Sequence, residues 1–141
     1  MTDPLAPFHL AIPVDDLDKA RAFYCGTLGC NTGRTATRWI DLNFFGHQLT
    51  LHLVDDHQGF ANTNPVDGDN VPARHFGVIL PRDTWQSVAD RLQAAACEFL
   101  ISPRIRFEGQ VGEQATMFLH DPAGNALEFK SFADPAQLFA V

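Results

Sequence analysis

The sequence has no long hydrophobic run, few basic side chains and few cysteines. No apolar stretch in the 141 residues approaches the roughly 20 residues that span a bilayer, and the first residues show no basic segment followed by an apolar one. We therefore expect no membrane span and no signal peptide, and we expect a cytoplasmic protein. Ten Lys and Arg stand against 17 Asp and Glu, which gives a formal net charge of −7. This balance disfavours nucleic acid and anionic membranes as partners, because both bind basic surfaces.

The cysteines Cys25, Cys30 and Cys97 are odd in number and have no CxxC spacing. We therefore expect reduced thiols that contribute to packing. The chain also has no glycine-rich phosphate-binding motif and no GxSxG nucleophile elbow. With 45% hydrophobic and 19% charged residues it has the composition of a globular protein, and its length predicts one domain over residues 1–141.

The predicted elements of the first half are a strand, a helix and three more strands. The helix is expected from about Leu17 to Leu28, capped by Asp15 or Asp16 and ended by Gly29. The strands are expected at 8–14, about 32–37, 38–44 and 48–54.

The second half repeats this order. A helix is expected over about 84–96, with Asp83 and Gln86 at the spacing of a capping box and an apolar stripe that includes Trp85 and Ala96. The strands are expected at 74–80, 98–101, 115–119 and 126–132, and polar loops at 55–73 and 102–114. Each half is therefore predicted to have the order β-α-β-β-β.

Three metal-binding residue types interrupt short apolar strands: His9, His75 and Glu128. Side chains of a strand alternate between its two faces, so each of the three is predicted to lie mid-strand, opposite the bulky apolar residues, where it can face a cavity. Two imidazoles and one carboxylate form the 2-His-1-carboxylate set that suits non-heme Fe(II) and leaves coordination positions open.

The order of elements and several motifs resemble the vicinal oxygen chelate superfamily, which contains glyoxalase I, extradiol dioxygenases, fosfomycin-resistance enzymes and bleomycin-binding proteins. The resemblance covers nearly all of residues 6–132 and is strongest to a group of extradiol-dioxygenase-like proteins. Its motifs are FHLAIPV at Phe8–Val14, NFFGHQL at Asn43–Leu49, GEQATMF at Gly112–Phe118 and DPAGNALEF at Asp121–Phe129.

The resemblance implies an α+β fold in which two βαβββ modules, about 6–55 and 73–132, form a curved mixed sheet around a metal-binding bowl, with helices on its outer face. It implies that His9, His75 and Glu128 bind a divalent metal, and that His52 stands at the position of a further ligand in glyoxalase I. His52 is either that fourth ligand or a catalytic acid or base, since imidazole exchanges protons near neutral pH. The metal favoured is Fe(II), with manganese, nickel, zinc or cobalt also compatible with these ligands.

The function that this resemblance favours is a ring-cleaving, extradiol-type dioxygenase acting on a small substrate chelated through two neighbouring oxygens. The alternatives are a glyoxalase-type isomerase or lyase, a thiol transferase of the fosfomycin-resistance type, and a small-molecule-binding protein without catalysis. A homodimer is the expected assembly of the superfamily. Extradiol enzymes typically also have a histidine and a tyrosine close to the metal ligands, but Tyr24, the only tyrosine, falls in an apolar helical stripe.

The roles of several further polar residues are predicted only from their positions in the predicted loops and turns. Arg106 and Gln114 are candidates for the rim of the substrate site, although both fall in or beside a predicted polar loop. His47, His57 and His120 lie in or beside turns and are interpreted as surface residues.

Overall fold

The computed structural model describes residues 5–56, 63–66 and 68–140 and, except for residues 63–66, their side chains. The chain divides into two compact units, Met1–Gln58 and Gly59–Val141. That both belong to one domain over 1–141 stays a prediction. Among the described residues, no helix has the length and apolar character needed to cross a membrane.

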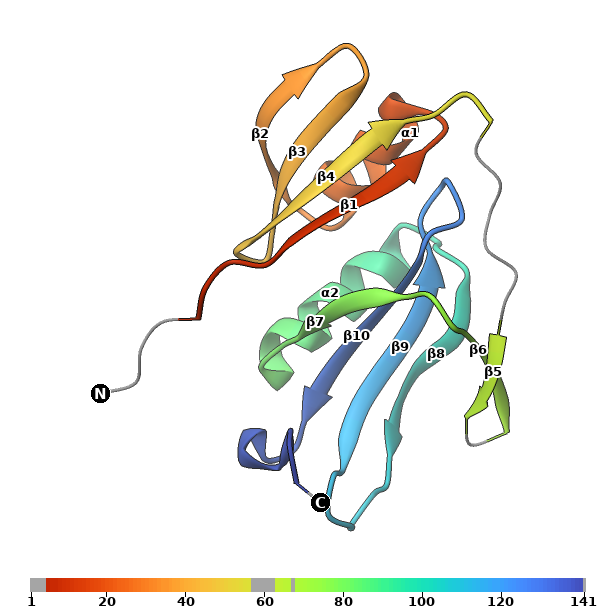
Figure 1. Ribbon diagram of the computed structural model, residues 1–141. Coiled ribbons are helices and arrows are strands. Elements are labelled where there is room, and N and C mark those ends of the chain that lie inside the picture. Colours follow the sequence, from red (N-terminus) through yellow and green to blue (C-terminus); the bar gives the residue numbers. More distant parts are fainter. Residues whose placement is uncertain (1–4, 57–62, 67, 141) are drawn as a thin grey trace. The chain divides into compact units, whose positions relative to one another are not determined.

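The first unit is a four-stranded mixed sheet with one helical segment (Figure 1). Strand β1 pairs in parallel with β4, and β4, β3 and β2 pair antiparallel, so the order is β1-β4-β3-β2. The elements are β1 (His9–Val14), α1 (Leu17–Arg21), the π-helical segment η1 (Ala22–Thr27), β2 (Asn31–Ala36), β3 (Trp39–Phe44) and β4 (His47–Leu53).

The helical segment of the first unit begins and ends where the sequence predicts. The carboxylate of Asp16 accepts a hydrogen bond from the backbone N–H of Lys19 (3.0 Å), which is the bond that an N-cap supplies. Gly29 follows the last turn with a φ of 80°, a conformation that glycine adopts without a steric penalty. Phe23 and Tyr24 are buried from this segment, so its apolar stripe packs as predicted.

The second unit repeats the same topology after an additional hairpin (Figure 1). Its main sheet has the order β7-β10-β9-β8, with β7 parallel to β10 and the other pairs antiparallel. Its elements are the hairpin strands β5 (Thr63–Val66) and β6 (Asp69–Pro72), then β7 (Phe76–Ile79), α2 (Arg82–Ala94), β8 (Phe99–Arg106), β9 (Gln114–His120), β10 (Ala126–Phe132) and the 3-10 turn η2 (Pro135–Gln137).

Helix α2 covers one face of this sheet (Figure 1). Its buried side chains Trp85, Val88 and Leu92 meet the face from which Leu127 and Phe129 project, both fully buried. The indole Nε1–H of Trp85 donates to the backbone carbonyl of Phe129 (2.9 Å). Because this face holds the core of the unit, the side chains that alternate with it lie on the opposite face.

These units confirm the predicted α+β fold with two βαβββ repeats, as two four-stranded mixed sheets. Two predicted loops were wrong in part. Within 55–73 the chain forms the hairpin of β5 and β6, and within 102–114 strand β8 continues to Arg106. Both segments are polar, but strand pairing uses backbone groups that composition does not reveal. Register shifts along β8 accommodate Pro103 within the edge strand.

The start and end of α2 also differ from prediction. The N-cap position is Pro81, Asp83 lies inside the first turn, and the side chain of Gln86 donates to Asp90 (3.0 Å), so no capping box forms. Ala96 lies beyond the helix with a φ of 56° and is exposed, because the helix ends at Ala94, two residues before the predicted stripe does. His57 lies outside the described residues.

Candidate metal centre

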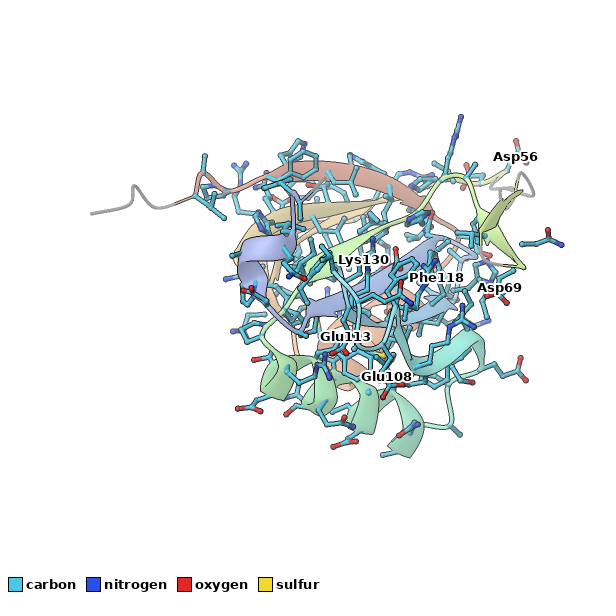
Figure 2. All side chains as sticks on the ribbon, turned by 90° about the horizontal axis from the view of Figure 1, so that it is seen from below. Asp56, Asp69, Glu108, Glu113, Phe118 and Lys130 are labelled. Carbon is cyan, nitrogen blue, oxygen red and sulfur yellow. The ribbon has the colours of Figure 1, made fainter. Side chains whose placement is uncertain are left out.

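Polar side chains gather on the face of the second unit's sheet that α2 does not cover. In the antiparallel pair of β9 and β10, Glu128 stands opposite Phe118 and Lys130 opposite Thr116, so all four side chains share one face. Figure 2 labels two of these four residues, Phe118 and Lys130. Parallel pairing of β7 with β10 sets Gly77 beside Glu128. His75 immediately precedes β7, which brings its imidazole to the same place.

His75 and Glu128 face each other across this pairing. The imidazole Nε2 of His75 lies 3.4 Å from Oε1 of Glu128. The other carboxylate oxygen, Oε2, accepts a hydrogen bond from the hydroxyl of Thr116 (2.6 Å), and Nζ of Lys130 lies 3.8 Å from Oε1. The side chain of Glu128 is 7% exposed and that of His75 is 32% exposed. A buried carboxylate therefore has one oxygen held by a hydroxyl and the other turned toward an imidazole.

The two groups shift each other's pKa. The hydrogen-bonding interaction with the Glu128 carboxylate raises the pKa of His75 above 6.5; burial opposes this, and the Pro72 carbonyl adds to it. Burial acts to raise the pKa of Glu128. The hydrogen bonds from His75 and Thr116 and the charge of Lys130 outweigh burial and hold that pKa below 4.5. Glu128 is therefore ionised at neutral pH.

The second ring nitrogen of His75 has its own partner. Nδ1 lies 2.8 Å from the carbonyl oxygen of Pro72. A carbonyl only accepts, so this contact requires a proton on Nδ1. When His75 is protonated, Nε2–H also donates to Glu128; in the neutral imidazole, Nε2 carries the lone pair that a metal would take. Histidines that bind metals are usually held this way, by an acceptor on the nitrogen that does not bind.

The distance between the two groups fits a shared divalent ion. Two ligand atoms about 2.1 Å from one metal lie about 3.0 Å apart at a right angle and about 3.4 Å apart at the tetrahedral angle. The observed 3.4 Å between Nε2 of His75 and Oε1 of Glu128 agrees with this range. It is longer than the roughly 2.8 Å of a strong charged hydrogen bond. His75 and Glu128 therefore fit as two of the three predicted ligands.

Gly77 permits the close approach of β7 to Glu128. A Cβ atom added at Gly77 would overlap the backbone carbonyl oxygen of Glu128. Only glycine fits at this point of the strand pair, which lets His75 and Glu128 lie side by side.

The first unit places His9 and His52 at opposite ends of one strand pair. His9, the first residue of β1, stands beside Gln48 of β4, and His52 stands beside Pro13. Four residues of parallel strand, about 13 Å, separate these positions. Both imidazoles are exposed. His9 and His75 are thus at strand starts rather than mid-strand as predicted, and only Glu128 is mid-strand.

The registers of the two units show which residues correspond. In the second unit His75 precedes Phe76, which pairs with Leu127, and Glu128 follows. In the first unit His9 precedes Leu10, which pairs with Leu49, and Thr50 follows. Thr50, rather than His52, therefore occupies the place of Glu128, and its hydroxyl donates to the buried carboxylate of Asp41 (2.7 Å). By the same count, His52 corresponds to Lys130.

The predicted rim residues lie on the face of the second unit that carries Glu128. Arg106 ends β8 and pairs with Gln114, the first residue of β9, two positions before Thr116 on the same face. Gln114 is 9% exposed. Its amide N–H donates to the Gly112 carbonyl (3.3 Å), whereas its buried Oε1 accepts no hydrogen bond from any residue that the structure describes. Arg106 is half-buried, with its guanidinium 5.1 Å from the ring centre of Phe107. Neither residue belongs to a solvated loop.

Thr116 and Lys130, which border Glu128, were missed in the sequence. Strand alternation would have found them, since each lies two residues from Phe118 or Glu128 along its strand. Within residues 5–56, 63–66 and 68–140, no three His, Cys, Asp or Glu side chains form a group that could hold a metal. His75 and Glu128 are the two predicted ligands that the structure brings together.

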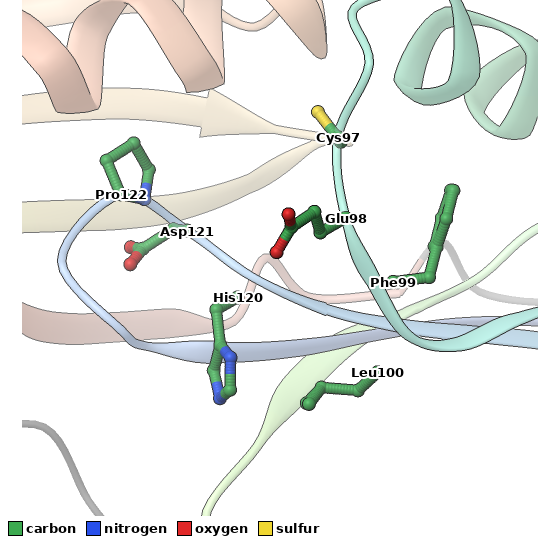
Figure 3. A pocket seen from close by; sticks show the side chains of 7 residues that line it. All are labelled: Cys97, Glu98, Phe99, Leu100, His120, Asp121 and Pro122. Atoms are coloured by element: carbon green, nitrogen blue, oxygen red, sulfur yellow. The ribbon is translucent and has the colours of Figure 1, made fainter.

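Another pocket of the second unit, of about 330 Å³, lies at the start of β8 and the end of β9 (Figure 3). The carboxylate of Asp121 in this pocket accepts hydrogen bonds from the backbone N–H groups of Ala123 and Asn125 and from the side-chain amide of Asn125. Burial raises the pKa of the Cys97 thiol, which disfavours a reactive thiolate. The residues that line this pocket are Cys97, Glu98, Phe99, Leu100, His120, Asp121 and Pro122. The pocket contains neither His75 nor Glu128.

All three cysteines, including Cys25 and Cys30, are free, as the sequence predicts. Tyr24 is fully buried, so its hydroxyl is not available at a site.

Comparison with known proteins gives a consistent result. A family model described as Glyoxalase/Bleomycin resistance protein/Dioxygenase superfamily matches residues 7–129. A solved glyoxalase/bleomycin resistance protein/dioxygenase from Alicyclobacillus acidocaldarius is 36% identical, with 99% of this chain and 100% of that chain covered and a TM-score of 0.82. No curated protein matches the chain.

Two more distant structures share the fold. The fosfomycin resistance protein FosX from Listeria monocytogenes is 15% identical, with 97% of this chain and 98% of that chain covered and a TM-score of 0.67. The lactoylglutathione lyase from Agrobacterium tumefaciens is 21% identical, with 99% and 100% covered and a TM-score of 0.66.

Proposed function

Because the chain belongs to the glyoxalase/bleomycin resistance protein/dioxygenase superfamily, we propose that it is an enzyme that uses a divalent metal to act on a small molecule with two adjacent oxygens. Superfamily members are usually enzymes and generally use divalent metal ions. They commonly form dimers, and we expect a homodimer.

The observation that carries this proposal is the pairing of His75 with Glu128. The two ligand atoms lie 3.4 Å apart, and the Pro72 carbonyl occupies the nitrogen of His75 that would not bind. An ionised carboxylate and a neutral imidazole with a fixed tautomer are the forms in which these side chains bind metals. We take His9 as the third ligand from the sequence prediction.

Thr116 and Lys130 orient the Glu128 carboxylate and stabilise its charge. Thr116 fixes one oxygen of Glu128 and so directs the other toward His75. The ammonium of Lys130, 3.8 Å from the same oxygen, stabilises the ionised carboxylate. When bound, a divalent ion would act as a Lewis acid on two substrate oxygens, and Fe(II) would also activate O2.

The reaction that we propose is extradiol-type ring cleavage with Fe(II). Two histidines and one carboxylate are the ligand set of non-heme iron oxygenases. We assign proton transfer to His52, because its imidazole is exposed, its register position differs from that of Glu128, and Tyr24 is buried. Gln114 and Arg106 are proposed to border the substrate.

The test is O2 uptake by iron-loaded protein with a panel of catechols. We expect uptake with at least one catechol, a much reduced rate in Glu128→Gln, and an unchanged rate in Glu98→Gln, a matched change at an exposed carboxylate. Uptake that Glu128→Gln leaves intact, or none across the panel with iron bound, would contradict the proposal. Lactoylglutathione formation from methylglyoxal and glutathione, without O2 uptake, would replace it with a glyoxalase-type activity.

A further inference from the structure

The hairpin of β5 and β6 comes shortly before His75 in the chain, and the carbonyl of Pro72, its last residue, contacts the His75 imidazole. Figure 1 shows it as a separate two-stranded sheet beside the start of β7. It belongs to the second unit, as do His75 and Glu128. The hairpin is not part of the βαβββ repeat, because the first unit has no strand before β1 in its described residues.

Two anchors fasten strand β6 to the main sheet. The buried side chain of Val71 forms a cluster with Ile101 of β8 and Phe118 of β9. At the start of the same strand, the carboxylate of Asp69 pairs with the guanidinium of Arg104 on β8 (2.5 Å). Figure 2 labels Asp69 and Phe118, one residue from each anchor. These contacts fix β6 against the sheet face that carries Glu128.

The strand fixed in this way ends at the partner of His75. Pro72 follows Val71, and its carbonyl oxygen lies 2.8 Å from Nδ1 of His75. Phe118 is a second link between β6 and His75. It contacts Val71, and its ring packs edge-on against the His75 imidazole, with ring centres 4.8 Å apart. The imidazole is therefore held by a hydrogen bond to the last residue of β6 and by a ring contact with Phe118, a side chain that clusters with Val71 of β6.

We propose that the β5–β6 hairpin is a positioning element for His75, in which Val71 and the Asp69–Arg104 pair hold the Pro72 carbonyl where it fixes a proton on Nδ1 and directs Nε2 to Glu128. Asp69, Val71 and Arg104 are positioning residues, because they act through Pro72 and Phe118. The consequence for metal affinity rests on the proposed function, whereas the consequence for the tautomer does not.

The first measurement is the tautomer of His75 in the metal-free protein, from the ring nitrogen chemical shifts at a pH well above the pKa of His75. We expect the Nδ1–H form in the unmodified protein and in Val71→Ile, which keeps the apolar contact. In Val71→Ala and in Asp69→Asn we expect a mixture of both tautomers. The control is Asp55→Asn, which removes the Arg38–Asp55 pair (3.1 Å) of the first unit and should leave the tautomer unchanged. Asp69→Asn creates no cavity, so it keeps the test valid if Val71→Ala fails to fold.

The second measurement is the affinity for Mn²⁺ or Zn²⁺ by titration calorimetry. Loss of a group that orients a ligand typically weakens metal binding 10–100-fold, and we expect about tenfold in Val71→Ala and Asp69→Asn. A single unchanged tautomer in both folded variants would overturn the inference. If the unmodified protein binds no metal but its variants lose the tautomer, the proposed function fails and the positioning role stands.

Discussion

At the residue scale, the candidate centre depends on the separate roles of the two oxygens of Glu128. One accepts from the Thr116 hydroxyl and the other faces His75 and Lys130. A carboxylate buried on a strand needs such partners, because leaving it unpaired would be costly. The same contacts that make the buried charge tolerable also orient it as a ligand.

Replacing Thr116 by Val tests the first of these contacts. Thr116 is fully buried, and the change removes its hydroxyl with little change in shape. We expect the free energy of unfolding to fall by about 1–3 kcal/mol, because a buried charged acceptor loses its donor. Thr37→Val, at an exposed position, should change it by less than about 0.5 kcal/mol. Urea denaturation of both variants measures the difference, and equal small effects would show that the hydrogen bond contributes nothing.

The His75–Glu128 pair also predicts how stability of the metal-free protein depends on pH. The raised pKa of His75 gives stability that is fully present below pH 6.5 and is lost as the pH rises through the folded-state pKa. The lowered pKa of Glu128 gives stability that is present above pH 4.5 and is lost as the pH falls through the folded-state pKa. The contribution is therefore largest between these two values.

The measurement is thermal unfolding across that range for the unmodified protein and for Glu128→Gln. We expect the difference between them to be largest near the middle of the range and to shrink on both sides. A difference that stays constant with pH would mean that the pair is not ionised as described.

At the scale of elements, β7 can bring His75 to β10 only because residue 77 has no side chain. A Cβ there would overlap the Glu128 carbonyl oxygen, which is backbone and cannot turn aside. The parallel pairing of these two strands is thus a condition for the centre as well as for the sheet.

We predict that Gly77→Ala destabilises the second unit by more than about 3 kcal/mol or prevents its folding, since overlap with a backbone atom forces the strands apart. The matched control is Gly26→Ala, because a Cβ at that helical position meets nothing within 4 Å. That change should be neutral or should stabilise by up to about 1 kcal/mol. Circular dichroism on heating compares the two, and similar melting temperatures would contradict the predicted overlap.

The sequence predicted the strands of the centre but not the hairpin beside it. A period of two placed Glu128 opposite Leu127 and Phe129, and the structure confirms that alternation. The β5–β6 hairpin was interpreted as a loop, because Val71 is stabilised by residues about 30 and 47 positions further along the chain, which no local pattern reveals. The register that matches Thr50, and not His52, to Glu128 also depends on pairing between strands.

At the scale of the whole molecule, the two units share one topology but have different polar side chains at corresponding positions. At corresponding register positions, the first unit has Thr50 and His52 where the second has Glu128 and Lys130. Repetition therefore supplies the framework twice, whereas the paired imidazole and carboxylate occur only in the second unit among the described residues.

The most direct test of the central claim is elemental analysis of the purified protein by mass spectrometry, beside His75→Ala, Glu128→Gln and the control His120→Ala, an exposed histidine at the end of β9. We predict about one divalent transition metal per chain in the unmodified protein and in the control, and a large loss of metal in the other two variants. Metal that remains in His75→Ala and Glu128→Gln, or none bound by any form after reconstitution, would contradict the assignment of this pair as metal ligands.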